Sequence, residues 1–453
     1  MAKASLKERP AYRCGECGLA VPQWVGRCPE CQAWGSVAEV GAPRLVPVAR
    51  PVSAAAQPIA AVSATAARAR PTGISELDRV LGGGLVPGAV ALLAGEPGVG
   101  KSTLLLEVAA GAAGAERPSL VVTGEESAAQ VRLRADRIGA LSPHVYLAAE
   151  NDLGALVSHV DNVKPGLLVV DSVQAVSAAE ADGAAGGVTQ VREVAGALIR
   201  LAKERDLATV LVGHVTKDGQ IAGPRMLEHL VDVVLQFEGD RHSRLRMIRA
   251  VKNRYGPTDE VGCFDITDAG ITALPDPSGL FLCHRGEPVS GTCVTVTLEG
   301  RRPLVAEVQA LVGTTELPMA RRACSGLDNA RVAMVLAVCE RRAGIRLARQ
   351  DVFAATVGGV RLAEPATDLA VALAIAGAAT DRAVPPDLIA VGEVGLAGDV
   401  RPVRGVARRL AEASRLGFRR ALVPDEAGPI SSELKVVTVA DVSSAIRAGL
   451  VSR

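Results

Sequence analysis

Residues Gly95 to Ser102 read GEPGVGKS, and this stretch decides the fold. It fits the phosphate-binding loop G-x-x-x-x-G-K-[ST]. The apolar run AVALLAG at 89–95 predicts a buried strand before the loop, and Lys101–Ala112 predicts a helix after it. The glycines let backbone N–H groups point at phosphate, and the helix amino terminus adds partial positive charge. We therefore expect Lys101 to reach the β and γ phosphates of a nucleotide and Ser102 to hold Mg²⁺.

The residues around the loop predict an α/β fold. Short Val- and Leu-rich runs alternate with amphipathic stretches, which is typical of a parallel sheet covered by helices on both faces. We expect strands at 119–124, 144–148, 166–171 and 208–215, and helices at Ala128–Ile138 and Gln190–Arg205. The runs HLVDVVLQFEGD and RLRMIRAVKNRYG then predict two adjoining strands.

Three carboxylates follow predicted strands and are candidates for ATP chemistry. Asp171 ends the run LLVVD, where a carboxylate is expected to orient Mg²⁺ through water. The stretch TGEES at 123–127 places Glu125 and Glu126 beside the expected γ phosphate. One of the two is expected to polarise the attacking water, and the other can equally be a helix first-turn charge. We favour Glu125 as the base.

Composition limits the function classes. The chain has 453 residues, of which 49% are hydrophobic and only 2% aromatic, so Ala, Val and Leu must build its cores. Lys+Arg 50 against Asp+Glu 49 leaves a net charge of +1, so any nucleic-acid contact needs local basic patches. No apolar run of about 18 residues and no signal peptide appear, which predicts a cytoplasmic protein without membrane contact.

The first 37 residues predict a metal site. Cys14, Cys17, Cys28 and Cys31 have the spacing of a tetrahedral Zn²⁺ ribbon. So short a segment cannot bury a useful core, so metal binding would supply most of its folding free energy. Trp24 and Trp34, the only tryptophans, can either stack on bases or cover the metal site. The other five cysteines are scattered, which argues against a disulfide framework.

The pattern changes again near residue 272. Strands are expected at 293–300 and 304–313, followed by a long helix at 329–344. We therefore predict four segments: a four-cysteine zinc finger at 1–37, an Ala- and Pro-rich linker at 38–66, an ATPase domain at 67–272, and a further domain at 273–453.

The turn VKNRYG, residues 251–256, carries two cations at the end of a predicted strand. Lys252 and Arg254 are two residues apart and point the same way, so they can reach DNA phosphates or the γ phosphate bound by a neighbouring subunit. Tyr255 can stack on a base or pack beneath the turn.

The stretch GHVTKDG follows the strand at 208–215. His214 or Thr216 can sense the γ phosphate, although a buried histidine bonded to the backbone is an equal alternative. Lys217 and the turn after it can form a loop that contacts DNA.

Taken together, the four-cysteine finger and the motifs GEPGVGKST, GEES, VVDS, GHVTKDG and KNRYG resemble the bacterial RadA (Sms) family of DNA repair proteins over essentially the full length. The resemblance implies a RecA-type P-loop ATPase core, a small N-terminal zinc ribbon with four cysteine ligands and a C-terminal α+β domain like that of Lon protease. It implies a hexameric ATP-driven motor on single-stranded and branched DNA that promotes branch migration alongside the RecA recombinase.

The resemblance also implies residue roles. Nucleotide binding is implied for Gly95, Glu96, Pro97, Gly98, Val99, Gly100, Lys101, Ser102 and Thr103. Zinc is implied at the four cysteines, in a finger that contacts RecA. DNA binding coupled to ATP is implied for Lys252 to Gly256. The catalytic residues are then Lys101, Glu125, Asp171, Lys252 and Arg254, and the DNA-binding residues are Lys252, Arg254 and Lys217.

The C-terminal segment resembles a protease domain without its dyad. Ala366 and Ala407 occupy the positions of the serine and the lysine, so neither can perform peptide hydrolysis. Ser325 and Thr367 are nearby hydroxyls that leave the register open. The arginine-rich stretches at 341–349 and 401–410 suggest a basic surface for duplex DNA. An ATP-dependent protease and a regulatory ATPase resembling KaiC are the alternative functions.

Overall fold

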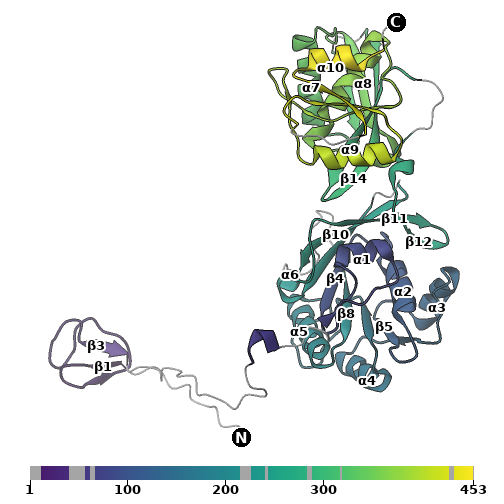
Figure 1. The fold of residues 1–453 in the computed structure, drawn as a ribbon. Coiled ribbons are helices and arrows are strands. Elements are labelled where there is room, and N and C mark those ends of the chain that lie inside the picture. Colours follow the sequence, from purple (N-terminus) through teal and green to yellow (C-terminus); the bar gives the residue numbers. More distant parts are fainter. Residues whose placement is uncertain are drawn as a thin grey trace. The chain divides into compact units, whose positions relative to one another are not determined.

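The strand before the phosphate loop, β4 (Val90–Gly95), has all of its residues buried in the computed structural model of the chain. The structure describes residues 12–39, 57–61, 67–214, 226–239, 243–282, 288–316, 319–427 and 433–451. The chain divides into two units, Met1–Ser63 and Ala64–Arg453, and β4 lies in the second (Figure 1).

β4 lies inside a nine-stranded sheet of order β12-β11-β10-β9-β4-β8-β7-β5-β6. From β9 to β6 the strands are parallel, which confirms the predicted sheet. These strands are β5 (Ser119–Thr123), β6 (Val145–Ala149), β7 (Leu167–Asp171), β8 (Ala208–His214) and β9 (Val233–Glu238). The parallel order brings the carboxyl ends of β4, β5, β7 and β8 to one edge of the sheet.

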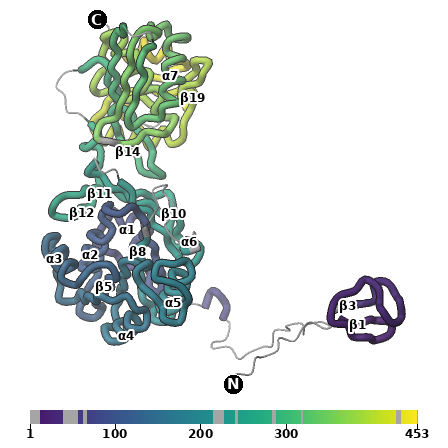
Figure 2. Tube along the Cα trace, turned by 180° about the vertical axis from the view of Figure 1, so that it is seen from behind, coloured from purple at the N-terminus to yellow at the C-terminus, as the bar shows by residue number. Residues whose placement is uncertain are grey.

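Helices cover both faces of this sheet, as predicted. Alternate residues of β4 belong to two different apolar clusters: Ala91 and Leu93 pack with α1, α2 and α3, whereas Val90 and Leu92 pack with α4, α5 and α6. The helices are α1 (Ser75–Leu81), α2 (Lys101–Ala112), α3 (Ala128–Arg137), α4 (Leu153–Val163), α5 (Val188–Glu204) and α6 (Met226–Leu230). Figure 2 traces the chain through these elements from behind.

Three antiparallel strands extend the sheet beyond β9. The predicted neighbour of β9 is β10 (Leu245–Asn253), which pairs with it antiparallel and carries a bulge between Ala250 and Lys252. β11 (Val261–Thr267) and β12 (Gly270–Ala273) form a further hairpin that the sequence did not predict.

A second, seven-stranded sheet of order β15-β16-β14-β13-β17-β20-β21 forms the C-terminal domain. α7 (Asn329–Arg342), α8 (Asp368–Thr380) and α10 (Val442–Gly449) contribute to one apolar cluster, and α9 (Val406–Arg415) contributes to another. The strands are β13 (Thr292–Glu299), β14 (Arg302–Thr314), β15 (Arg322–Ser325), β16 (Gln350–Thr356), β17 (Leu388–Ala390), β20 (Arg420–Pro424) and β21 (Lys435–Val439). The mixed α+β architecture agrees with the predicted domain class.

The first unit contains a small three-stranded sheet of order β2-β1-β3. Its strands are β1 (Tyr12–Cys14), β2 (Ala20–Val21) and β3 (Val37–Glu39). The linker expected at 38–66 therefore begins inside β3, and most of it lies outside the described residues. Within the described part of the chain, every helix is too short or too polar to cross a membrane.

Candidate functional site

The phosphate loop joins β4 to α2 and turns on glycines. Gly98 (φ 83°) and Gly100 (φ 112°) have left-handed backbone conformations that other residues rarely adopt. A Cβ on Gly95 would lie 2.5 Å from Phe237 O, and one on Gly100 would lie 2.5 Å from Ile271 Cδ1. The predicted residues 95–103 thus form one tight loop and the first turn of α2, where a helix amino terminus favours an anion.

Lys101, the first residue of α2, is buried and folds back over the loop. Its Nζ donates hydrogen bonds to the carbonyl oxygens of Gly95 (2.7 Å) and Glu96 (3.0 Å). Burial lowers the pKa of Lys101, and the negative charges of Asp171 and Glu125 oppose that shift. The ammonium group therefore contacts the loop and lies within electrostatic reach of two carboxylates.

Asp171 and Glu125 come together because β5 and β7 are neighbours in the sheet. Gly124 N donates to Asp171 O at 3.0 Å, and the Glu125 carboxylate accepts a hydrogen bond from Ser172 Oγ. Both carboxylates influence the pKa of Lys101. The structure thus brings three predicted catalytic residues to the edge of the sheet that carries the phosphate loop.

Glu126, the alternative base, is engaged elsewhere. Its carboxylate forms an ion pair of 2.6 Å with Arg134 of α3. Thr123 Oγ1 accepts a hydrogen bond from the Glu126 backbone at 3.1 Å, which fixes the turn after β5. This arrangement favours Glu125 over Glu126 as the residue beside a γ phosphate.

The basic turn, defined here as residues 252–256, lies at the opposite end of the strands from the phosphate loop. Because β10 is antiparallel to β9, its last residue pairs with Val233 at the start of β9. Val233 also pairs with Ala91, which precedes Gly95 by four residues on β4. At about 3.3 Å per residue, turn and loop are separated by about 13 Å along the strands. The cations of the turn are therefore not part of the phosphate site of their own chain.

Lys252 binds the backbone carbonyls at the C-terminal end of helix α6. Its Nζ donates to the carbonyl oxygens of Glu228 (2.8 Å), His229 (3.3 Å) and Val231 (2.7 Å). Burial and the charge of nearby Arg254 lower the pKa of Lys252. The lysine is thus held by three backbone carbonyls.

Arg254 is held by a buried carboxylate that the sequence analysis missed. Its Nη1 lies 2.9 Å from Asp232 Oδ1, and the second oxygen of Asp232 accepts a hydrogen bond from Val90 N at 3.1 Å. The signal was an acidic residue inside the apolar run LVDVVLQF. Arg254 remains 53% exposed and Tyr255 45% exposed. The turn therefore presents a cation and a ring to solvent on a fixed support, and Tyr255 is not packed away beneath it.

Of the two candidate γ-phosphate sensors, only His214 lies within the described residues. His214 ends β8 and pairs with Gly95 in the sheet register, so its backbone lies beside the start of the phosphate loop. Thr216 and Lys217 lie outside the described residues.

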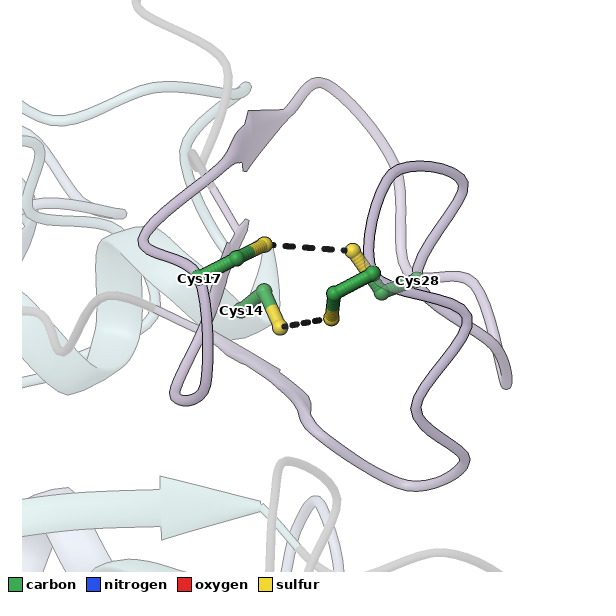
Figure 3. A group of neighbouring side chains, drawn as sticks. Cys14, Cys17 and Cys28 are labelled. Carbon is green, nitrogen blue, oxygen red and sulfur yellow. Dashed lines mark hydrogen bonds between the residues drawn. The ribbon is translucent and has the colours of Figure 1, made fainter.

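The four predicted zinc ligands form one cluster. Their sulfur atoms all lie within 4.8 Å of one another. Cys14 and Cys31 are 3.6 Å apart, and Cys17 and Cys28 are 3.5 Å apart, as the dashed lines of Figure 3 mark. A hydrogen bond with Ser36 lowers the pKa of Cys14 to about 6, which favours the thiolate form. Four thiols at this spacing fit a tetrahedral Zn²⁺ ion.

The two tryptophans do not cover the metal site. Trp24 is 63% exposed and Trp34 77% exposed. A Cβ on Gly26 would lie 3.8 Å from one ring and 3.9 Å from the other, so both rings flank this glycine. The guanidinium of Arg27 stacks 5.8 Å from the Trp34 ring centroid. The interior of the ribbon is instead formed by Tyr12, Cys14, Leu19, Val21, Val25, Cys28 and Val37.

The positions of the protease dyad hold two methyl groups. Ala366 is 1% exposed and packs in the apolar cluster beneath α9, whereas Ala407 is exposed on that helix. Thr367 is buried and donates to Glu364 O at 2.9 Å. Ser325 is exposed at the end of β15. Neither hydroxyl takes the place of the missing nucleophile.

The two arginine-rich stretches differ in exposure. In the first, Arg341, Arg342, Arg346 and Arg349 are all exposed. In the second, Arg409 is fully buried, forms an ion pair with Glu364 and donates to Val296 O at 2.5 Å. The expectation of a basic surface is therefore wrong at Arg409, because its helical position faces the core.

Comparisons with known proteins give a consistent result. The chain matches an AAA domain over residues 56–220, a rubredoxin metal binding domain over 12–39, and subunit ChlI of Mg-chelatase over 358–427. DNA repair protein RadA of Mycolicibacterium smegmatis is 55% identical over 98% of this chain and 97% of its own length. The RadA proteins of Mycobacterium tuberculosis (54% identical, 97% and 93%) and Streptococcus pyogenes (43%, 98% and 99%) are similar over comparable lengths.

Removing one zinc ligand should unfold the ribbon without stopping ATP turnover, because the ligands and the phosphate loop belong to different units. For Cys28→Ser we expect zinc content, measured by mass spectrometry, to fall toward zero. The near-ultraviolet circular dichroism of the two tryptophans, both in the ribbon, should be lost. Cys324→Ser on β15 is the control and should keep both signals. Full zinc content in Cys28→Ser would contradict the assignment.

Proposed function

The chain belongs to the RadA family of DNA repair proteins, and on that premise we propose that it is an ATP-driven motor on single-stranded DNA. Its AAA domain is the ATPase. The proposed task is branch migration of recombination intermediates in the cytoplasm, alongside the RecA recombinase. Single-stranded and branched DNA are the proposed substrates.

For ATP hydrolysis we assign the roles by position. The amides of residues 95–103 would hold the phosphates, and Lys101 would neutralise the β and γ groups. Oxygen ligands suit Mg²⁺, so the Ser102 hydroxyl would hold the ion and the Asp171 carboxylate would orient it through water. Glu125 would polarise the attacking water, because its carboxylate lies beside Asp171 and Lys101 while Glu126 is paired with Arg134.

The observation that carries the proposal is the separation of the basic turn from the phosphate loop of the same chain. A head-to-tail ring, proposed here as a homohexamer, would place the turn of one subunit at the loop of the next. Lys252 and Arg254 would then touch the neighbour's γ phosphate, DNA, or each in turn. This provides a route from DNA contact to ATP turnover.

DNA contacts are proposed at two surfaces. The half-exposed Arg254 and Tyr255 offer a phosphate ligand and a ring for base stacking, with Lys217 as a further cation. The exposed arginines of 341–349 would attract duplex DNA to the C-terminal domain. Branched DNA offers both forms at once.

RecA contact is proposed at the zinc ribbon. Exposed tryptophan with a stacked arginine is the composition of protein interface hot spots. Between β1 and β3, Arg13 and Arg27 are matched by Glu16 and Glu30, so this surface has no excess positive charge to attract a polyanion. A protein partner therefore fits the ribbon better than DNA.

The two alternative functions fit less well. An ATP-dependent protease needs a nucleophile where Ala366 is buried. A regulatory ATPase like KaiC needs neither a metal ribbon nor a Lon-like domain, and both segments match family models here.

The choice of base can be tested with neighbouring glutamates. Glu125→Gln should lower kcat by about 10²–10⁴-fold, as expected for loss of a general base, while nucleotide binding is retained. Glu126→Gln is the matched control, because its carboxylate pairs with Arg134, and should turn over ATP near the wild-type rate. ATP turnover and fluorescent nucleotide titration give the two readouts, and the reverse ranking would assign the base to Glu126.

The basic turn can be tested with Lys252→Ala and Arg254→Lys, the second of which keeps a charge against Asp232. We expect both to lose the stimulation of ATP turnover by single-stranded DNA. Lys101→Ala should lose turnover but still bind DNA. Lys203→Ala, exposed on α5, should behave as wild type.

Mixing Lys101→Ala with Arg254→Lys subunits separates the possible sites of action. If the turn acts on the neighbouring subunit, we expect the mixture to recover part of the DNA-stimulated ATP turnover. Some mixed interfaces then combine the intact loop of an Arg254→Lys subunit with the intact turn of a Lys101→Ala subunit. Normal DNA binding and normal stimulation in both turn variants would refute the assigned role.

The ribbon surface can be tested by replacing both tryptophans with alanine. Binding to RecA should weaken by roughly 30-fold, the effect of about 2 kcal/mol at a hot spot, with zinc content unchanged. Leu133→Ala, an exposed apolar residue of α3, is the control for binding measured by interferometry. Loss of single-stranded DNA binding with RecA binding intact would instead assign the pair to base stacking.

A further inference from the structure

The tip of the hairpin between β13 and β14, residues Glu299–Arg302, reaches the strands around the basic turn. Arg249 of β10 donates to the Glu299 carboxylate at 2.6 Å. Arg301 N donates to Asp259 O at 2.6 Å, three residues beyond the basic turn. Gly300, between Glu299 and Arg301, has φ 60°, and a Cβ on it would lie 2.3 Å from Asp259 O, so only glycine fits at this position.

Arg302 makes the buried contact of this hairpin tip. It is 5% exposed and forms an ion pair with Glu76 of α1, which is fully buried. Its guanidinium also donates to the carbonyl oxygens of Val261 (3.1 Å), Leu274 (3.1 Å) and Pro275 (2.5 Å). One planar guanidinium thus connects the first strand pair of the C-terminal sheet to α1, β11 and the segment after β12.

Helix α1 carries this contact to the basic turn. Glu76, in its first turn, also accepts a hydrogen bond from Cys263 N at 2.9 Å. At the last turn, the carbonyl oxygens of Val80 and Leu81 accept hydrogen bonds from Asn253 Nδ2, both at 3.3 Å. The helix is only about 10 Å long at its rise per residue, so a displacement at one end moves the other.

Glycines permit backbone contact on both sides of α1. A Cβ on Gly262 of β11 would lie 2.5 Å from Glu76 O. A Cβ on Gly256, the last residue of the basic turn, would lie 3.1 Å from Gly82 Cα at the end of α1. Both contacts bring backbone against backbone, so the basic turn packs closely on the helix.

We infer that Arg302 is a positioning residue that couples the C-terminal domain to the basic turn through Glu76, α1 and Asn253. The inference rests on the proposed function, because its output is the response of ATP turnover to DNA. DNA that displaces the C-terminal domain moves β13 and β14, and their tip moves α1 and the turn. The desolvation of a buried ion pair offsets most of its attraction, so the pair adds little net stability. We therefore assign to it the role of orienting the hairpin tip against α1.

The test compares full-length variants at two adjacent arginines. Glu76→Gln combined with Arg302→Met removes both buried charges and leaves neither unpaired, whereas Arg302→Met breaks the pair alone. Arg301→Met is the matched control, because Arg301 is 48% exposed and lies 3.6 and 3.8 Å from its carboxylates. ATP turnover is measured with and without a poly-dT oligonucleotide.

We expect unchanged turnover without DNA in all three variants. DNA stimulation should fall on the order of tenfold in both Arg302 variants, within the usual range of coupling between sites, and stay normal in Arg301→Met. A folded double variant with wild-type stimulation overturns the coupling. A wild-type chain that DNA does not stimulate refutes the proposed function instead.

Hydrogen exchange of the wild-type chain decides the case if the double variant does not fold. With a non-hydrolysable ATP analogue bound, poly-dT should alter amide exchange in α1 and in the hairpin tip together with the basic turn. A change in the turn that leaves α1 and the hairpin tip unaltered overturns the inference.

Discussion

The direction of β10 relative to β4 decides what this chain can complete alone. β4, β5 and β7 are parallel, so Lys101, Glu125 and Asp171 gather at one edge of the sheet. β10 is antiparallel to its neighbour and ends at the other edge, where the basic turn follows it. Ladder hydrogen bonds fix these directions, and no side-chain rearrangement can bring both groups together within one chain. The nucleotide bound by the chain's own phosphate loop is therefore out of reach of the turn, which is why we propose that a second copy or DNA supplies its phosphate.

Local signals made the ATPase core predictable. GEPGVGKS contains glycines where the backbone needs left-handed φ, and the predicted helix Lys101–Ala112 is found with the same bounds. The predicted strand at 89–95 starts one residue early. Runs rich in Val and Leu identified most of the other parallel strands, because strands covered on both faces are predominantly apolar. The cysteine spacing likewise predicted a cluster that the folded ribbon contains.

Contacts between distant residues could not be predicted in this way. Glu76 and Arg302 are 226 residues apart, and neither neighbourhood marks the other as a partner. The exposure of the two tryptophans, which argues against a role in covering the metal site, depends on how the ribbon folds and could not be predicted either. Arg409 is different, because its burial was readable: Val406, Leu410 and Ala413 form an apolar helical stripe, and Arg409 lies within it. The prediction of a basic surface at 401–410 did not take this helical period of apolar residues into account.

Two arginine–glutamate pairs hold the β13–β14 hairpin near its tip. Glu364 accepts hydrogen bonds from two residues of β13, Thr297 Oγ1 and Leu298 N, both at 3.0 Å. It also pairs with the buried Arg409 of α9. At the start of β14, Arg302 pairs with Glu76 of α1. Aromatics are only 2% of the chain, and Arg409 is among the largest fully buried side chains. Its position is fixed by directional hydrogen bonds and not by ring packing. Such bonds tolerate little displacement, so this end of the hairpin is held to helices of both sheets at once and transmits motion between them.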